Sequence, residues 1–144
     1  MTTETSDGIA SAVAEAGVAT RAYPHGGVIF VKDDPADCAY VIVSGRVEIR
    51  ETGRVLESIG PNEIFGEVGM IDGGSRSASA VAVGATEVRV IDRSTFDRLL
   101  RESPDFVMAI MRDMARRLRV MNANQRPATG LPLVPSRLEK RTAG

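Results

Sequence analysis

The chain has 144 residues, 43% of them apolar and 26% charged, which is ordinary for one globular domain with a hydrophobic core. Its 18 basic residues nearly balance its 19 acidic ones, so net charge favours neither nucleic acid nor a membrane surface as a bulk partner. The single cysteine, Cys38, and the single histidine, His25, exclude an internal disulfide framework and a metal site built from several Cys or His ligands.

The sequence carries no sign of membrane insertion or export. No apolar run approaches the roughly 18 residues that a membrane-spanning helix requires. The first residues, MTTETSDG, are acidic and polar, unlike the basic start and apolar core of a secretory signal. We therefore expect a cytoplasmic protein without a membrane partner.

Short β-branched runs, separated by turn residues, begin near residue 18. The runs lie at 28–31, 39–43, 46–50, 54–59, 78–83 and 87–91. Many short strands at this spacing indicate an antiparallel sandwich or barrel. Ser44-Gly45 and Thr52-Gly53 are predicted to form tight hairpin turns, so that successive strands would pair as a meander.

Helical patterns flank the strands. An Ala-rich helix is predicted over 9–16, with Gly17 ending it. After the strands, Asp92 or Ser94 is the expected N-cap of one helix, and Ser103-Pro104 is expected to begin another. That last helix is predicted over about 104–124, because its apolar residues recur at three-four spacing. These residues are Phe106, Val107, Ile110, Met111, Met114, Leu118 and Met121.

These patterns predict one domain with two loosely ordered ends. Residues 1–8 are expected to be disordered, and residues 127–144 are expected to form a flexible tail. The domain between them, 9–126, would hold the strands over about 18–92 and two C-terminal helices over about 93–124. The arginines at 116, 117 and 119 are interpreted as the solvated face of the last helix rather than as a nucleic-acid site. Its methionine stripe is interpreted as core, part of which would form a homodimer seam in the alternative interpretation.

The stretch Phe65–Ala82, FGEVGMIDGGSRSASAVA, is the most informative part of the chain. Its glycines and small residues let a backbone approach a ligand closely, since few Cβ groups stand in the way. Arg76 offers a planar fork of donors that suits a phosphate or a carboxylate. Glu67 supplies a second polar group, so the stretch is predicted to be an anion cradle. A structural ion pair between Glu67 and Arg76 is the competing interpretation.

This stretch resembles the phosphate-binding cassette of the cyclic-nucleotide-binding domain family, whose pattern is F-G-E-x-(A/G)-L followed by x-R-(S/A/T)-A. The family includes catabolite-activator-type regulators, the regulatory subunit of cAMP-dependent kinase and cyclic-nucleotide-gated channels. The resemblance extends over about 23–124. Supporting segments are DDPADCAYVIVSGRVEI at 33–49, which resembles the opening hairpin, and PDFVMAIMRDMARRLRVMN at 104–122, which resembles the closing helix.

The resemblance implies an antiparallel β-roll, also called a jelly-roll or double-stranded β-helix, with a short N-terminal helix and two C-terminal helices. It implies cAMP or cGMP as a regulatory ligand, and no cofactor. Arg76 would pair with the phosphate, Ser77 would donate to a phosphate oxygen, and Glu67 would accept from the ribose 2′-OH. The ligand-binding residues implied are Phe65, Gly66, Glu67, Val68, Arg76, Ser77, Ala78 and Asn122.

Two segments depart from the family pattern. Asp33 stands where the opening hairpin usually has a glycine, and we expect the turn to be preserved because Asp tolerates left-handed backbone. The closing helix has Met121 and Asn122 where the catabolite-activator branch places a Thr-Ser pair against the base. Asn122 can hydrogen-bond a base edge, but a polar helix-end role is the simpler interpretation, so the choice between cAMP and cGMP stays open.

The function expected from this resemblance is a cytoplasmic sensor that binds a cyclic nucleotide and rearranges its C-terminal helices. The output would be an effector protein or a change in self-association. One alternative is the ligand-binding fragment of a catabolite-activator-type transcription regulator, since the tail after Pro127 is too short and irregular for a helix-turn-helix of its own. Another is a β-roll interaction module that has lost nucleotide binding. An enzyme is not expected, because no nucleophile, base and orienting group stand together in the sequence.

Overall fold

The computed structural model describes residues 2–124. It divides into two units, one ending at Met111 and the other beginning at Arg112. The strands are β1 (Thr20–Tyr23), β2 (Val28–Phe30), β3 (Cys38–Glu51), β4 (Arg54–Ile59), β5 (Ile64–Phe65) and β6 (Ser79–Asp92). The helices are α1 (Thr2–Glu15), α2 (Glu67–Asp72), α3 (Arg93–Glu102) and α4 (Pro104–Asn124). The predicted tail and the last two residues of the predicted domain, 125–126, lie outside the described residues.

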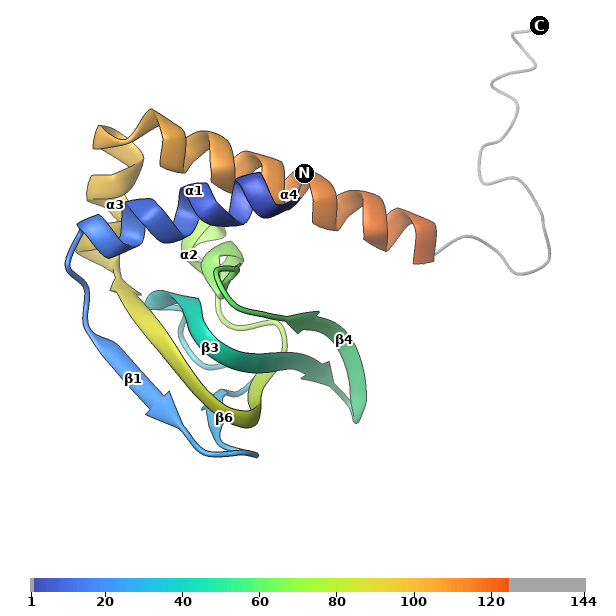
Figure 1. Cartoon of the computed structure of the whole chain (residues 1–144). Helices are drawn as coiled ribbons and strands as arrows, with labels where there is room; N and C mark the ends of the chain where they lie inside the picture. The colour runs from blue at the N-terminus through green and yellow to red at the C-terminus, as the bar shows by residue number, and fades with distance from the viewer. Residues whose placement is uncertain (1, 125–144) are drawn as a thin grey trace, which may run out of the picture. The chain divides into compact units, whose positions relative to one another are not determined.

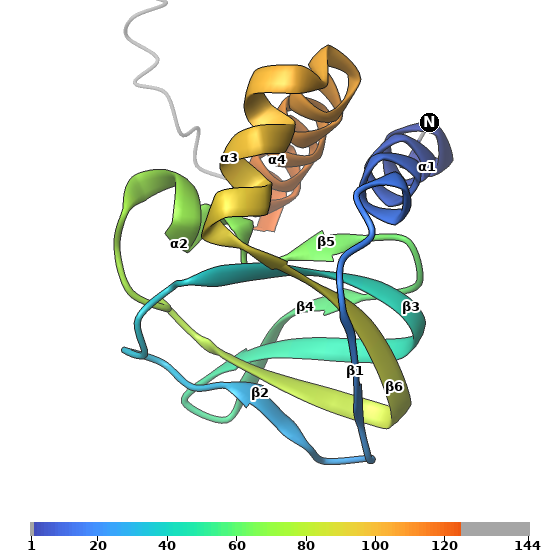
Figure 2. The same ribbon diagram turned by 90° about the vertical axis from the view of Figure 1, so that its left-hand side faces the viewer.

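All strands belong to one antiparallel six-stranded sheet in the first unit (Figure 1). Its strand order is β1-β6-β3-β4, with β2 also paired to β6 and β5 also paired to β3. Figure 2 shows α1, α2 and α3 on one side of the strands. Antiparallel strands rolled beneath a cover of helices confirm the predicted fold class.

The two longest strands, β3 and β6, pair along most of their length and bend opposite one another. The register between them shifts on both sides of Ser44, which marks a β-bulge. At Gly45 φ is +94°, and a Cβ there would overlap the Thr86 side chain and the Ala85 carbonyl. Only glycine fits this close approach of two backbones. The predicted hairpin at Ser44-Gly45 is therefore wrong, because the chain bends there but continues as the single strand β3.

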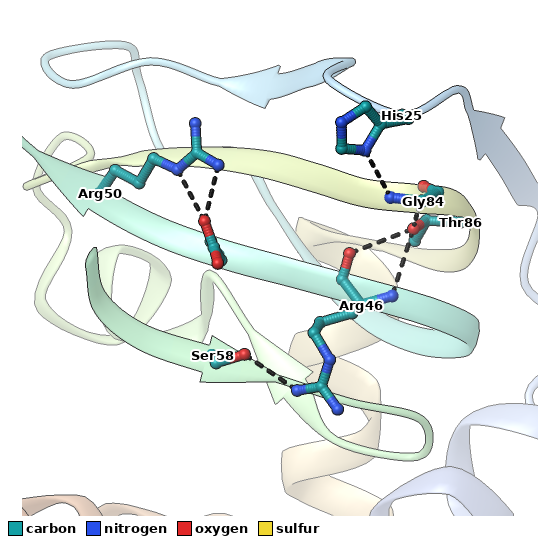
Figure 3. Close-up of polar contacts among 7 residues, drawn as sticks. His25, Arg46, Arg50, Ser58, Gly84 and Thr86 are labelled. Atoms are coloured by element: carbon teal, nitrogen blue, oxygen red, sulfur yellow. Dashed lines mark hydrogen bonds and ion pairs between the residues drawn. The ribbon is translucent and has the colours of Figure 1, made fainter. Parts of the chain in front are cut away.

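Hydrogen bonds fasten the bend from both sides (Figure 3). The Thr86 hydroxyl donates to the Arg46 carbonyl at 3.1 Å, and the Arg46 amide lies 3.3 Å from the same oxygen. Gly84, with φ of +78°, donates its N–H to His25 Nδ1 at 2.8 Å. His25 lies in the turn between β1 and β2 and links this turn to β6. The predicted meander is also wrong, since β6 inserts between β1 and β3.

The second predicted hairpin is confirmed. β3 and β4 are consecutive antiparallel partners, and Glu51 faces Arg54 across the turn. Thr52 and Gly53 have φ of 53° and 75°, the two positive values of a type I′ turn. This turn matches the right-handed twist of the strands, so a two-residue connection suffices.

The helices begin largely where the cap residues predict. Asp92 is the N-cap of α3, and its side chain accepts from the Thr95 N–H at 2.8 Å. Ser103 caps α4 by accepting from the Phe106 N–H at 3.1 Å. Helix α1 begins at Thr2, so the prediction of disorder before residue 9 is wrong. Once the Ala-rich turns have formed, each further residue adds a hydrogen bond without a new nucleation step.

Apolar side chains from the roll and from the covering helices make up the core of the first unit. Its buried cluster comprises Tyr40, Ile42, Val47, Ile59, Phe65, Ala80 and Val88. In the helical layer Ile9 and Val13 of α1 are buried, and Phe96 of α3 meets Phe106 edge-to-face with ring centroids 5.8 Å apart. This packed core supports the loops that connect the strands of the roll.

The second unit comprises the part of α4 from Arg112 onward. Asp113 is buried and pairs with Arg116 Nη2 at 2.7 Å and with Arg117 Nε at 3.3 Å. These are the i,i+3 and i,i+4 spacings at which helical charges meet. Arg119 is exposed and the Arg116 side chain is 34% exposed, which agrees with the interpretation of a solvated arginine face. The Arg117 side chain is only 15% exposed and departs from it. No helix within residues 2–124 is long and apolar enough to cross a membrane.

Candidate functional site

The cassette begins where β5 turns abruptly into α2. Phe65 ends the strand buried in the core, and Gly66 follows as the helix N-cap with φ of 81°. A Cβ at Gly66 would lie 3.0 Å from Arg76 Nη1, 3.4 Å from Tyr40 Cδ2 and 3.5 Å from Phe30 Cε2. Both the left-handed backbone and the crowding require glycine here. Residues 67–72 then form the short helix α2.

Arg76 is turned into the protein, with an exposed fraction of 4%. Its Nη1 donates to the Gly66 carbonyl at 2.7 Å and its Nη2 donates to the Cys38 carbonyl at 2.6 Å. The guanidinium thereby joins the start of α2 to the start of β3. Its Nε is buried and has no hydrogen-bond partner within residues 2–124. A buried donor without a partner costs about 1–3 kcal/mol, so it calls for an explanation.

Aromatic rings surround this guanidinium. Its Cζ lies 4.1 Å from the centroid of the Phe30 ring and 5.9 Å from that of Tyr40, both within cation–π range. The Tyr40 ring stacks on Phe65 with centroids 5.0 Å apart and planes 17° apart. Phe30 lies 6.0 Å from Tyr40 and 6.2 Å from Phe65, centroid to centroid. The Arg76 guanidinium therefore packs against an aromatic layer made of Phe30 from β2, Tyr40 from β3 and Phe65 from β5.

The backbone of Arg76 is held as well. The Asp33 N–H donates to the Arg76 carbonyl and the Arg76 N–H donates to the Asp34 carbonyl, both at 2.8 Å. Pro35 and Ser75 form an adjacent isolated bridge. Asp33 has φ of 77°, which confirms that the turn is preserved without the family's glycine. The turn after β2 and the arginine segment thus form a short antiparallel pair.

The other predicted cassette residues differ widely in exposure. Glu67 is fully buried at the first turn of α2, and Ala78 is buried just before β6. Val68 is 49% exposed and Ser77 is exposed as well. The structure brings Phe65, Gly66 and Arg76 into contact, directly or through Tyr40. No metal centre is indicated, since residues 2–124 contain no group of three or more His, Cys, Asp or Glu that could hold one.

Burial changes the acid–base behaviour of two groups in the aromatic layer. The Cys38 thiol donates to the Tyr40 hydroxyl at 3.1 Å. Desolvation raises the pKa of Tyr40, and its hydrogen bond with Cys38 raises it further. Desolvation also raises the pKa of Cys38, against the opposing effect of the Tyr40 hydrogen bond. Both groups therefore stay neutral near pH 7, and Arg76 faces uncharged neighbours in this layer.

The family model of the cyclic nucleotide-binding domain matches residues 20–103 of this chain. The chain belongs to the cyclic nucleotide-binding domain family. The match extends from β1 to the end of α3, so it includes the whole cassette and the buried Arg76. The antiparallel roll with its helices is the fold of that family.

Individual relatives agree with this assignment. The Cyclic AMP receptor protein of Thermus thermophilus is 39% identical over 104 residues, 69% of this chain and 48% of that protein. The CRP-like cAMP-activated global transcriptional regulator of Mycobacterium tuberculosis is 36% identical over 109 residues, 71% of this chain and 48% of that protein. The solved Catabolite Activator Protein of Thermus thermophilus has a TM-score of 0.70 and 34% identity, covering 82% of this chain and 57% of that one. This chain spans about half the length of the curated relatives it matches.

Asn122 and Met121 lie in the second unit of this cyclic nucleotide-binding domain protein. Asn122 is exposed on α4, and the side chain of Met121 lies outside the described part of the structure. The contact predicted between Asn122 and a nucleotide base stays a prediction. The other predicted ligand-binding residues, over 65–78, lie in the first unit.

Sequence reasoning missed the groups that hold Arg76 in place. Phe30, Tyr40 and the Cys38 carbonyl come from other strands, and none belongs to the cassette motif. Each is locally an ordinary strand residue. The sequence offers only an indirect signal for these two rings, which is that aromatic residues are few. The chain has 4 Phe and 2 Tyr, and Phe30 and Tyr40 are two of these six.

Proposed function

We propose that this protein is a cytoplasmic cyclic-nucleotide sensor that binds cAMP or cGMP in the cassette over 65–82. Arg76 would pair with the cyclic phosphate, Glu67 would accept from the ribose 2′-OH, and Ser77 would donate to a phosphate oxygen. The role is binding without catalysis, and α4 would carry the response to an effector protein or to self-association.

The buried guanidinium of Arg76 is the observation that carries this proposal. Both of its hydrogen bonds go to neutral carbonyl oxygens, so those contacts leave its positive charge unneutralised. A buried charge without a counter-charge is costly. A phosphate monoanion would supply that counter-charge, and one of its oxygens would accept from the buried Nε.

The remaining roles follow from donor and acceptor chemistry. An ionised carboxylate only accepts hydrogen bonds, so Glu67 suits a hydroxyl that donates, as the ribose 2′-OH does. The hydroxyl of Ser77 lies beside Arg76 in sequence and is exposed, which suits a contact with a ligand that arrives from solvent. The names of two relatives, a cyclic AMP receptor protein and a cAMP-activated regulator, support the same ligand class.

Isothermal titration calorimetry with cAMP and with cGMP tests the proposal. Wild type should bind at least one of them, and Arg76→Ala should weaken that binding by at least about thirty-fold, since truncating one partner of a buried charge pair costs several kcal/mol. Arg76→Lys should be intermediate, because it keeps the charge and loses the planar fork. Arg101→Ala, at an exposed position on α3, is the matched control and should bind like wild type.

Two outcomes would overturn the proposal. One is that wild type binds neither nucleotide, which would favour the non-binding interaction module. The other is equal affinity in wild type and Arg76→Ala, which would move the ligand away from the cassette. Circular dichroism and thermal unfolding of each variant must accompany the titration, because Arg76 also holds the Gly66 and Cys38 carbonyls.

A second function has support from the length of the relatives. Because this chain spans about half of two regulators, one of them named as transcriptional, it could act as the ligand-binding part of such a regulator. Gel-shift measurements with mixed DNA fragments, with and without the bound nucleotide, test whether this chain binds DNA by itself. Ligand-dependent DNA binding by this chain alone would contradict the sensor proposal.

A further inference from the structure

The Phe30 ring supports the guanidinium on which the proposed function depends. The ring centroid lies 4.1 Å from Arg76 Cζ, which is closer than the 5.9 Å that separates Tyr40 from the same atom. A cation over an aromatic face is attracted by the negative charge of that face, and the attraction strengthens when water is excluded. Arg76 is 4% exposed, so this contact is desolvated.

Several independent contacts fix the ring against the cassette. Within the sheet, Phe30 faces Ala80 of β6, four residues beyond Arg76 in the chain. The turn that follows β2 exchanges two backbone hydrogen bonds with Arg76 itself. The same ring packs on Tyr40 and Phe65. Strand β2 therefore contacts the side chain of the arginine, and the turn that follows β2 holds its backbone.

The guanidinium has five N–H donors in one plane. Two of them are engaged by carbonyls at the edge of that plane, and Phe30 covers one face. These contacts restrict the side chain to one orientation before any ligand arrives. A pre-oriented group loses less conformational entropy on binding than a mobile one, so the affinity for its partner is higher.

We propose that Phe30 is a positioning residue of the anion site: its ring holds Arg76 in the orientation that receives the cyclic phosphate. This inference rests on the proposed function, because it concerns the affinity for that ligand. The required feature is the π face of the ring. A branched aliphatic side chain at position 30 would fill part of the space and would not attract the cation.

The test compares Phe30→Leu with Phe30→Tyr. Leucine keeps apolar bulk and removes the π face, whereas tyrosine keeps the face. With cAMP and cGMP as probes in calorimetric titrations, Phe30→Leu should bind about three- to thirty-fold more weakly than wild type, the range expected of a lost cation–π contact. Phe30→Tyr should bind within about two-fold of wild type.

A matched control separates positioning from stability. Phe96→Leu removes one ring of the aromatic pair between α3 and α4, whereas the rings that lie over Arg76 are those of Phe30 and Tyr40. It should lower the unfolding temperature about as Phe30→Leu does and leave the affinity unchanged. In ligand-free protein, the NMR signal of the Arg76 Nε–H should be shifted upfield by the ring in wild type and in Phe30→Tyr, and should move downfield in Phe30→Leu.

The outcomes distinguish this inference from the proposed function. If wild type binds neither nucleotide, the proposed function fails and this inference fails with it. If wild type binds and Phe30→Leu binds equally well or more tightly, only the positioning role is overturned. Equal weakening in Phe30→Leu and Phe30→Tyr, or in Phe30→Leu and Phe96→Leu, would also overturn it, because packing or stability would then account for the effect.

Discussion

Replacing Gly69 by alanine should destabilise the protein, although glycine-to-alanine changes within helices usually stabilise. Gly69 lies in α2, inside the cassette. A Cβ built there would stand 2.5 Å from Ala36 Cβ, well inside the 3.5–4.0 Å at which carbon atoms pack. Ala36 is itself buried and has no flexible side chain that could swing away. One of the two backbones must therefore move by about 1 Å.

Two opposing effects set the magnitude. Alanine favours a helical backbone over glycine by at most about 1 kcal/mol. Forcing an extra methyl group into a packed contact costs about 1–3 kcal/mol. We expect the steric effect to win, with a net loss of about 1–2 kcal/mol. For a chain of this size that corresponds to a fall in Tm of about 3–10 °C.

Thermal and urea unfolding of a double-mutant cycle measure this effect. Ala36→Gly alone should cost about 1 kcal/mol, because it removes a buried methyl and loosens the loop. Together with Gly69→Ala it moves the methyl from one wall of the contact to the other, so the double variant should be more stable than the sum of the single changes by about 1–2 kcal/mol. Additive effects, or a Gly69→Ala protein more stable than wild type, would refute the reasoning.

The remaining predictions concern the bend and a helix cap. Gly45→Ala should cost at least about 3 kcal/mol, because a Cβ at φ of +94° is strained and also overlaps Thr86, whereas Gly84→Ala, with φ of +78° and open space around it, should cost only about 1–2 kcal/mol. Urea unfolding that ranks the two alike would contradict the bulge geometry. The hydrogen bond from the Thr95 N–H lowers the pKa of Asp92, so its stabilising effect is present above about pH 4 and is lost as pH falls. The stability difference between wild type and Asp92→Ala should therefore shrink from pH 7 to pH 3, and a constant difference would exclude the charged cap.

Local signals in the sequence predict the helices well. Asp92 and Ser103-Pro104 indicate where α3 and α4 begin, because a capping hydrogen bond joins residues only three positions apart. The bulge at Gly45 cannot be predicted from the sequence, for the opposite reason. A Ser-Gly pair between two β-branched runs looks the same in a hairpin and in a bulge, and the partner that decides between them, Thr86, is distant in sequence.

The candidate site likewise has a part that local sequence predicts and a part that depends on distant residues. Glu67 and Arg76 stand in a contiguous motif, so the family to which the chain belongs could be predicted from the sequence. Phe30 could not be predicted as part of the site, because its role depends on the pairing of β2 with β6 and on the turn that follows β2. The residues around Phe30 in the sequence do not indicate that a charged side chain packs on its ring.

The two backbone hydrogen bonds between the turn after β2 and the segment of Arg76 have a consequence for motion at the site. The N–H groups of Asp33 and Arg76 each donate to a carbonyl of the opposite segment, so both hydrogen bonds break when either segment moves away. The turn after β2 and the arginine segment therefore open together as one cooperative unit. An anion that secures Arg76 must therefore also slow the solvent exchange of the Asp33 N–H. A residue outside the proposed ligand contacts would then report whether the site is occupied.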